Sequence, residues 1–424
     1  MQLREFEVQG LFGRYHHKVP FPVSTPAEPK PSLVIIHGPN GVGKTTILRM
    51  IDGLMRLDFN IFRESPFERA TLRFEGGSSV EVKAATKDNK LDHLAVTNAG
   101  QTVKLHPARS GALEDADAPK IELFRANFFS ARESLAFEFI DTSRMIRQRQ
   151  PEEDDLERMR MIEVMMATQR ERHLVNPKAL APVERLNISD RIARFIGEAQ
   201  VNHRRFFASA ESDLFERILH KLGQLQESTF EVKPLLDRLS KIAIEDKRLK
   251  KMGIEVDDWK LSKIKKAVSA AAQGPAKEQA VIALGAFVEM LESRTSQRIL
   301  LADRIDTFLR VMEDFFHDKT LSVSAKTGLS ISTKTESPRA LKEGQLSTGE
   351  FHLLYLMVAA LVTQRRGTVI AIDEPEMSMH LAWQRKLIKA LFECASKAEP
   401  LFIFATHSPD VAADFPDALL EVGK

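Results

Sequence analysis

The stretch Val34-Ile-Ile-His-Gly-Pro-Asn-Gly-Val-Gly-Lys-Thr-Thr-Ile-Leu-Arg-Met50 joins an apolar run to a glycine-rich turn and then to a second apolar segment. The first run predicts a buried strand and the segment after Lys44 predicts a helix. Between them, residues 38–45 fit the pattern G-x-x-x-x-G-K-[ST] in register. Such glycines let backbone N–H groups converge on an anion, and the helix dipole reinforces the attraction. The stretch therefore predicts a phosphate-binding loop.

The loop supplies the first set of candidate ATP contacts. Lys44 is expected to reach the β and γ phosphates, and the Thr45 hydroxyl is expected to ligate Mg²⁺. The alternative is an ordinary glycine-rich turn without a ligand, which the complete pattern and its flanks disfavour. The candidate nucleotide-binding residues are Gly38, Pro39, Asn40, Gly41, Val42, Gly43, Lys44, Thr45 and Thr46.

A second apolar run, residues 368–372, ends in two acids, Asp373 and Glu374. Asp373 is a candidate magnesium ligand and Glu374 a candidate general base for the attacking water. The alternative is a helix N-cap followed by a solvated acid of the first turn. An acid pair at the carboxyl end of a parallel strand favours the catalytic interpretation, because such sheets bind ligands there.

A third apolar run, residues 401–406, ends at His407. A lone histidine is more often structural, and only its place at another strand end makes it a candidate contact for the γ phosphate. Ahead of both runs, Leu346-Ser-Thr-Gly-Glu350 opens an apolar helix. Ser347 is a plausible N-cap, and with Gly349 and the free helix N–H groups it also forms a candidate anion site.

The remaining chain indicates an α/β protein with an insertion. Alternating runs between residues 70 and 105, with a Gly76-Gly77 turn, predict a small antiparallel layer within residues 1–150. In residues 151–318 apolar residues recur at helical spacing, which predicts a helical domain or a short coiled-coil hairpin. Residues 319–424 again alternate strands and helices, as in a parallel sheet.

The four motifs, in this order along the chain, resemble the nucleotide-binding heads of the ABC class, in the soluble branch that includes SMC, RecF and OLD proteins. The resemblance implies an ABC-type ATPase head built from both ends of the chain. It also implies that two heads close face to face on ATP and Mg²⁺, with Ser347 and Gly349 acting in trans and His407 as the switch histidine. The stretch Glu376-Met-Ser-Met-His380 would lie at the dimer seam.

Two positions depart from that resemblance. His380 stands where many relatives carry aspartate. The glutamine that contacts magnesium in the family has two candidate counterparts, Gln148 and the segment Phe139-Ile-Asp-Thr-Ser-Arg144.

Composition excludes several classes. A single cysteine, Cys394, excludes a disulfide framework and fits a reducing cytoplasm. No apolar stretch approaches the roughly 20 residues of a membrane span, so we expect a cytoplasmic protein without membrane contact. The 61 Lys and Arg residues nearly balance the 59 Asp and Glu residues, so attraction to nucleic acid requires local patches.

Two functions of different class fit these features. The chain is similar to stand-alone ATPases of bacterial antiphage systems, of the Septu PtuA and PARIS AriA types, and we expect it to lack the nuclease domain that follows the histidine motif in OLD proteins. This similarity implies a sensor and scaffold that forms a homodimer or an assembly of dimers, responds to DNA or a phage-encoded trigger, and controls a separately encoded nuclease or toxin. The alternative is a RecF-like or SMC-like repair ATPase that clamps duplex DNA. Between Lys233 and Lys266 eleven basic residues face six acidic ones, which a solvated helix face also explains.

Overall fold

A computed structural model of the chain describes residues 2–22, 32–88, 90–106, 136–142, 187–202, 232–256, 259–271, 277–365, 367–395 and 398–423, with Phe124, Phe128 and Met145. The chain forms two compact units. The head unit comprises Met1–Leu186 and Ser347–Lys424, and the helical unit comprises Asn187–Leu346. The head unit is therefore assembled from both ends of the sequence.

A five-stranded parallel sheet organises the head unit, in the order β14-β3-β13-β12-β8. Parallel pairing places the carboxyl ends of neighbouring strands at one edge. The strand that leads into the phosphate loop is therefore next to the strand that His407 follows, which is next to the strand that ends at Asp373. The bounds are β3 Ser32–His37, β8 Phe137–Asp141, β12 Val369–Asp373, β13 Leu401–Thr406 and β14 Leu419–Glu421.

A six-stranded antiparallel sheet forms a second layer, in the order β2-β1-β4-β5-β6-β7. The meander predicted for residues 70–105 is confirmed, and Gly76 and Gly77 both adopt the positive φ that their turn requires. The bounds are β1 Leu3–Leu11, β2 Tyr15–Pro20, β4 Arg69–Phe74, β5 Ser79–Lys87, β6 Lys90–Asn98 and β7 Gln101–Leu105.

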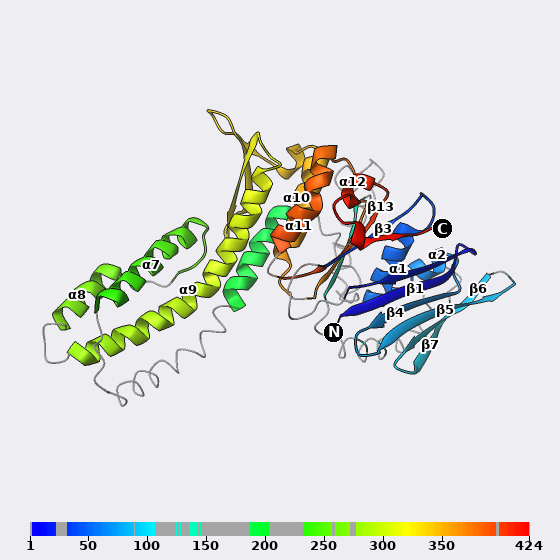
Figure 1. The fold of residues 1–424 in the computed structure, drawn as a ribbon, viewed down its shortest axis with the longest axis horizontal. Coiled ribbons are helices and arrows are strands. Elements are labelled where there is room, and N and C mark those ends of the chain that lie inside the picture. Colours follow the sequence, from blue (N-terminus) through cyan, green and yellow to red (C-terminus); the bar gives the residue numbers. More distant parts are fainter. Residues whose placement is uncertain are drawn as a thin grey trace, which may run out of the picture. The chain divides into compact units, whose positions relative to one another are not determined.

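Alternation along the parallel strands divides their side chains between two faces. Val369, Ala371 and Ile403 join the core shared with the antiparallel sheet and α1 (Lys44–Arg56). On the other face Phe402 stacks on Phe392 of α11 (Leu381–Ala395), at 5.7 Å between ring centroids. Helix α11 packs beside α10 (Thr348–Val362), as Figure 1 shows. Short helices complete the unit: α2 Ile61–Glu64, α12 Pro409–Ala412 and a 3₁₀ turn, η3 Pro416–Ala418.

The helical unit contains a helix at residues 188–202, then α7 (Val232–Lys251), α8 (Leu261–Ala271) and α9 (Lys277–Glu313). Arg238 pairs with Glu292, and ten residues later Arg248 pairs with Asp303 and Asp306. Helices α7 and α9 therefore run in the same direction. Of the two alternatives for the insertion, the described residues form a helical domain, in which α8 returns the chain between the parallel helices α7 and α9.

The helical unit extends further along the sequence than the predicted boundary at residue 318. Strands β9 (Lys319–Ser324), β10 (Gly328–Thr333) and β11 (Ala340–Leu341) form a small sheet in it, followed by the 3₁₀ turn η2 (Glu343–Gln345). Contacts at Ser189 explain this grouping. Its hydroxyl donates to the Leu329 carbonyl and its backbone N–H to Glu343 Oε1. Residues 319–346 are thus tied to helix 188–202 within the helical unit. The predicted helical face at Leu214–Leu225 lies outside the described residues.

Candidate functional site

The phosphate loop lies between β3 and α1, as the pattern predicts. Gly41 and Gly43 have φ angles of 83° and 97°, a region that glycine alone enters without strain. A Cβ on Gly43 would also lie 2.5 Å from Leu11 Cδ2. Backbone geometry and close packing therefore both require glycine at this position.

Lys44 is only 8% exposed and folds back over the loop. Its Nζ donates to the carbonyl oxygens of Gly38 and Pro39, at 2.8 and 2.9 Å. Burial lowers the pKa of Lys44, and the carboxylates of Glu374 and Asp373 oppose that shift. The lysine from the N-terminal part of the chain thus lies within electrostatic reach of acids about 330 residues away in sequence.

A direct contact joins the two halves of the site. Thr45 Oγ1 donates to Asp373 Oδ1 at 3.0 Å. Strand register sets Asp373 level with Asp141 on the neighbouring strand, and Arg49 of α1 pairs with Asp141 at 2.8 Å. Two strands and one helix therefore fix the position of the Asp373 carboxylate.

The donor set of Thr45 and Asp373 fits magnesium, a hard cation that prefers oxygen ligands. Asp373 is 7% exposed, and its burial raises its pKa to about 6, against the hydrogen bond from Thr45. A cation bound at these oxygens would offset the unfavourable burial of the carboxylate. The two side chains that would hold magnesium are therefore the pair that the sequence indicated.

Replacing Asp373 with asparagine is expected to stabilise the chain when no magnesium or nucleotide is present. Between the ordinary aspartate pKa and about 6 the folded chain retains a proton that the unfolded chain has released. Stability therefore falls as pH rises through this window and stays low above it. Asparagine avoids this cost, so we expect a gain on the order of 2 kcal/mol at pH 7.5 that shrinks at pH 5. Urea unfolding at both pH values measures it, with exposed Asp417→Asn as control; a less stable variant at pH 7.5 contradicts the burial argument.

Glu374 follows Asp373 in a left-handed conformation, with φ 49°, which is uncommon for a residue other than glycine. Its backbone N–H donates to the Ala405 carbonyl at 2.8 Å. His407 Nδ1 lies 3.6 Å from Glu374 Oε1, and both side chains are partly exposed. The structure thus brings together the candidate base and the candidate γ-phosphate sensor.

Glu376 is a buried acid for which the resemblance implied only a place at the dimer seam. It is 7% exposed and accepts a hydrogen bond from the Thr406 hydroxyl, whose oxygen in turn accepts from the Ser408 N–H. This chain of contacts fixes the backbone on both sides of His407. Two acids separated by proline, as in Glu374-Pro-Glu376, were the only sequence signal for it.

The Ser347 segment forms a helix start. Ser347 Oγ accepts from the Glu350 N–H at 3.2 Å, and Glu350 Oε2 accepts from the Ser347 N–H at 2.8 Å. This is a capping box, so the N-cap interpretation of Ser347 is confirmed. Ser347 is exposed and Gly349 is buried.

Gly349 has a packing role within the chain, and its replacement by alanine is expected to destabilise the head unit. A Cβ there would lie 2.3 Å from the backbone oxygen of Ser378. Overpacking of this kind costs about 1–3 kcal/mol. The matched control is Gly285→Ala in α9, where a Cβ meets open space and the change should stabilise by about 0.5–1 kcal/mol. Scanning calorimetry compares the two, and an unchanged Gly349→Ala melting temperature would refute the packing argument.

Other predicted residues have specific places. His380 precedes α11 and its Nδ1 accepts the Ala382 N–H at 3.2 Å, so it caps that helix. Two candidates were named for the position of the family's glutamine. Gln148 lies outside the described residues. In the other candidate segment, Thr142 donates a hydrogen bond to the backbone carbonyl of Asp373.

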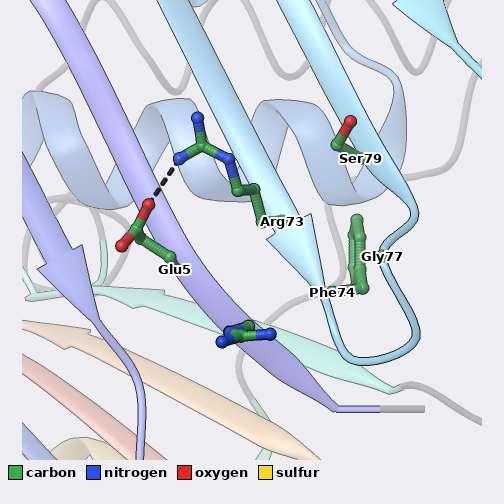
Figure 2. A pocket seen from close by; sticks show the side chains of 6 residues that line it. Glu5, Arg73, Phe74, Gly77 and Ser79 are labelled. Atoms are coloured by element: carbon green, nitrogen blue, oxygen red, sulfur yellow. Dashed lines mark hydrogen bonds and ion pairs between the residues drawn. The ribbon is translucent and has the colours of Figure 1, made fainter.

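Described residues of the head unit line a cavity at the phosphate loop and another on the antiparallel sheet. One, of about 520 Å³, adjoins the phosphate loop and is lined by residues that include Gly38, Pro39, Asn40 and His407. The second, of about 310 Å³, lies on the antiparallel sheet (Figure 2) and contains none of the predicted site residues. There Arg73 pairs with Glu5 and Glu7, and these ion pairs hold β4 to β1. Of these two cavities, the first is the one that adjoins the phosphate loop and His407.

The loop, its buried lysine and the Thr45–Asp373 contact define the class: the chain is a P-loop NTPase. A family model described as "AAA domain" matches residues 12–273, more than half of the chain, and the protein belongs to this family. A second model, described as "AAA domain, putative AbiEii toxin, Type IV TA system", matches residues 205–413. No curated protein matches the sequence.

Three solved structures show a distant likeness. The Smc head domain of Pyrococcus furiosus with an extended coiled coil, bound to the C-terminal domain of ScpA, has 14% identity and a TM-score of 0.39, covering 100% of this chain and 96% of that chain. An SmcHead bound to the C-winged helix domain of ScpA has 12% identity and a TM-score of 0.40, with coverage of 100% and 97%. The SMC head domain from Thermotoga maritima has 12% identity and a TM-score of 0.35, with coverage of 100% and 95%. Among the described helices, none has the length and apolar character to cross a bilayer.

Proposed function

We propose that this protein binds and hydrolyses ATP as an ABC-type ATPase of the SMC, RecF and OLD branch. The contact between Thr45 and Asp373 carries the proposal, because it joins a phosphate loop to a second acidic half-site across 328 positions of sequence. A phosphate loop without that second half would bind nucleotide but would lack a metal ligand and a base.

Each candidate residue has a separate role in binding or hydrolysis, according to its place in the site. Lys44 exchanges its loop carbonyls for phosphate oxygens, and Thr45 and Asp373 hold magnesium. When bound at these oxygens, magnesium would neutralise negative charge on the phosphates of ATP. Glu374 accepts a proton from the attacking water. His407, next to Glu374, hydrogen-bonds the γ phosphate and distinguishes ATP from ADP.

Two heads close on the nucleotide in this proposal. Ser347 is exposed at the start of α10, where it remains accessible to a partner head. ATP held between two heads contributes contacts to both, so closure depends on the γ phosphate and reverses after hydrolysis.

The biological role that we infer is control of a separate effector in bacterial antiphage defence. The match of residues 205–413 to a model named for a toxin–antitoxin system supports this role. A nuclease or toxin encoded beside this chain would be held in one nucleotide state and released in the other.

Phosphate release and light scattering test the proposal on the full chain. We expect magnesium-dependent ATP turnover and a nucleotide-dependent dimer. Co-purification with the product of the adjacent gene tests the defence role: an HNH-type neighbour indicates a Septu system and a TOPRIM-type neighbour a PARIS system. A chain that binds no ATP contradicts the proposal.

A DNA clamp is the second candidate, and one observation favours it. The arginines of α7 are used inside the helical unit, where Arg238 and Arg248 pair with acids of α9. The lysines are exposed and form no ion pair with any described residue. We call Lys233, Lys241, Lys247, Lys250 and Lys251 the lysine face. It extends about 27 Å along the helix at about 1.5 Å per residue.

The lysine face predicts binding to a phosphate backbone without sequence specificity, since lysines are flexible point charges that contact phosphates and not base edges. The double variant Lys247→Glu/Lys251→Glu should weaken binding of a fluorescent DNA duplex at least tenfold at low salt. The slope of the logarithm of affinity against the logarithm of salt concentration should fall by about two, because two phosphate contacts are lost. Lys326→Glu, an exposed change on the β9–β10 turn of the same unit, is the control. Equal binding by both variants refutes the clamp.

A further inference from the structure

His352, in the second turn of α10, is completely buried and contacts two other segments of the head unit. Its Nδ1 lies 2.9 Å from the Met377 carbonyl oxygen, and its Nε2 lies 3.3 Å from Thr142 Oγ1. Thr142 directly follows β8, and its hydroxyl donates to the Asp373 carbonyl at 2.6 Å. The helix that starts at Ser347 thereby contacts Thr142, the residue that bonds the end of the strand that carries the acids.

The link acts on one particular peptide group. The carbonyl of Asp373 accepts from Thr142, and the N–H of the same peptide group, which belongs to Glu374, donates to the Ala405 carbonyl. Both sides of the Asp373–Glu374 peptide are therefore fixed. This peptide determines the left-handed conformation of Glu374 and hence the direction of its carboxylate.

Proton counting shows that Thr142 has two competing acceptors. A carbonyl only accepts, so His352 Nδ1 must carry the proton that bonds Met377. Burial lowers the pKa of His352 to about 4, so the ring is neutral near pH 7 and Nε2 is an acceptor. The single hydroxyl proton of Thr142 can serve either Asp373 or Nε2, and the shorter distance to Asp373 shows which acceptor it serves in this structure.

Helix α10 also contacts the turn that follows Glu374. Besides the bond from His352 to Met377, Gly349 packs directly against the Ser378 backbone, and Ser378 is itself left-handed with φ 62°. Any shift of the first two turns of α10 must therefore change the turn at residues 374–379 or break these contacts.

We propose that Thr142 and His352 are a positioning pair that couples the Ser347 end of α10 to the Asp373–Glu374 peptide, and so adjusts the candidate base when that end of the helix is engaged. The inference rests on the proposed ATPase. It makes neither residue a ligand of nucleotide or magnesium. Loss of the pair should alter the rate of hydrolysis and leave ATP affinity nearly unchanged, because the phosphate loop supplies the binding contacts.

Turnover of the full chain at saturating ATP is the first test. Thr142→Val keeps the side-chain shape and removes the hydroxyl, and we expect kcat to fall about tenfold with KM for ATP changed less than about twofold. Thr142→Ser keeps the hydroxyl and should restore most of kcat. Thr97→Val is the matched control, since it removes a hydroxyl that bonds Thr102 on the antiparallel sheet. Unchanged kcat in Thr142→Val overturns the inference.

The double variant with His352→Phe tests whether the two residues act together. If they form one unit, the double variant should lose no more kcat than the worse single variant, whereas multiplying losses would show independent roles. Fluorescent-ATP titration establishes that each variant is folded. Hydrogen exchange of the nucleotide-free chain provides a readout that needs no turnover: Thr142→Val should speed exchange both at residues 374–379 and at 348–353. If the wild-type protein does not turn over ATP, the proposed ATPase activity is wrong, but the exchange experiment still tests the coupling. If hydrogen exchange in Thr142→Val is the same as in the wild type, the coupling is wrong.

Discussion

Replacing Lys44 with alanine is expected to weaken ATP binding at least about 100-fold, because the cation that would bind the phosphates is removed and charge-assisted hydrogen bonds are the strong ones. Lys44 Nζ now bonds two loop carbonyls, 2.8 and 2.9 Å away, and both contacts are available for exchange with phosphate oxygens. Fluorescent-ATP titration measures the loss directly.

The variant should remain folded. Burial of Lys44 lowers its pKa, so its charged form is disfavoured where it lies, and alanine removes that unfavourable burial. The matched control is Lys18→Ala on β2, an exposed lysine that pairs with Glu5 at 2.8 Å. Wild-type affinity in a folded Lys44→Ala chain would show that the loop does not hold the nucleotide.

Replacing Glu374 with glutamine is expected to reduce ATP turnover by about 10² to 10³ and to leave ATP bound. Glutamine keeps the size of the side chain but accepts no proton from water. Thr45, Asp373 and Lys44 are unchanged, so nucleotide and magnesium contacts persist. Single-turnover kinetics with labelled ATP measures the chemical step apart from binding.

Trapped ATP should also trap the closed dimer. Light scattering of Glu374→Gln with ATP is expected to give twice the mass of a single chain, and ADP should not. Glu64→Gln, at the exposed end of α2, provides a control that changes the same kind of side chain away from the site. A Glu374→Gln variant that hydrolyses ATP normally, or stays monomeric with ATP, contradicts the assigned base or the closure.

Local patterns in the sequence predicted several elements correctly. The phosphate loop needs only a strand, a few glycines at positive φ and a helix, all within about 20 residues. The meander needs only period-two alternation and glycine turns, and both were visible between residues 70 and 105. Asp373 and His407 were found because each ends an apolar run, which is a local signal for a strand end.

Distant contacts were not visible in the same way. The return to the head was predicted at residue 319, but pairing of Ser189 with Leu329 and Glu343 keeps residues 319–346 in the helical unit. Strand character alone does not reveal which sheet a strand joins. The parallel course of α7 and α9 likewise depends on which acids Arg238 and Arg248 meet.

The sequence by itself determined the chemistry that is present: a cradle for phosphate, an acid pair and a histidine, each at the end of a strand. Only the tertiary structure decided that Thr45 meets Asp373 and that Thr142, which contacts His352, bonds the Asp373–Glu374 peptide. The physical reason is the range of the forces that decide each feature. Backbone conformation and apolar periodicity act over a few residues, whereas contacts across 210 to 328 positions form only when the whole head unit packs.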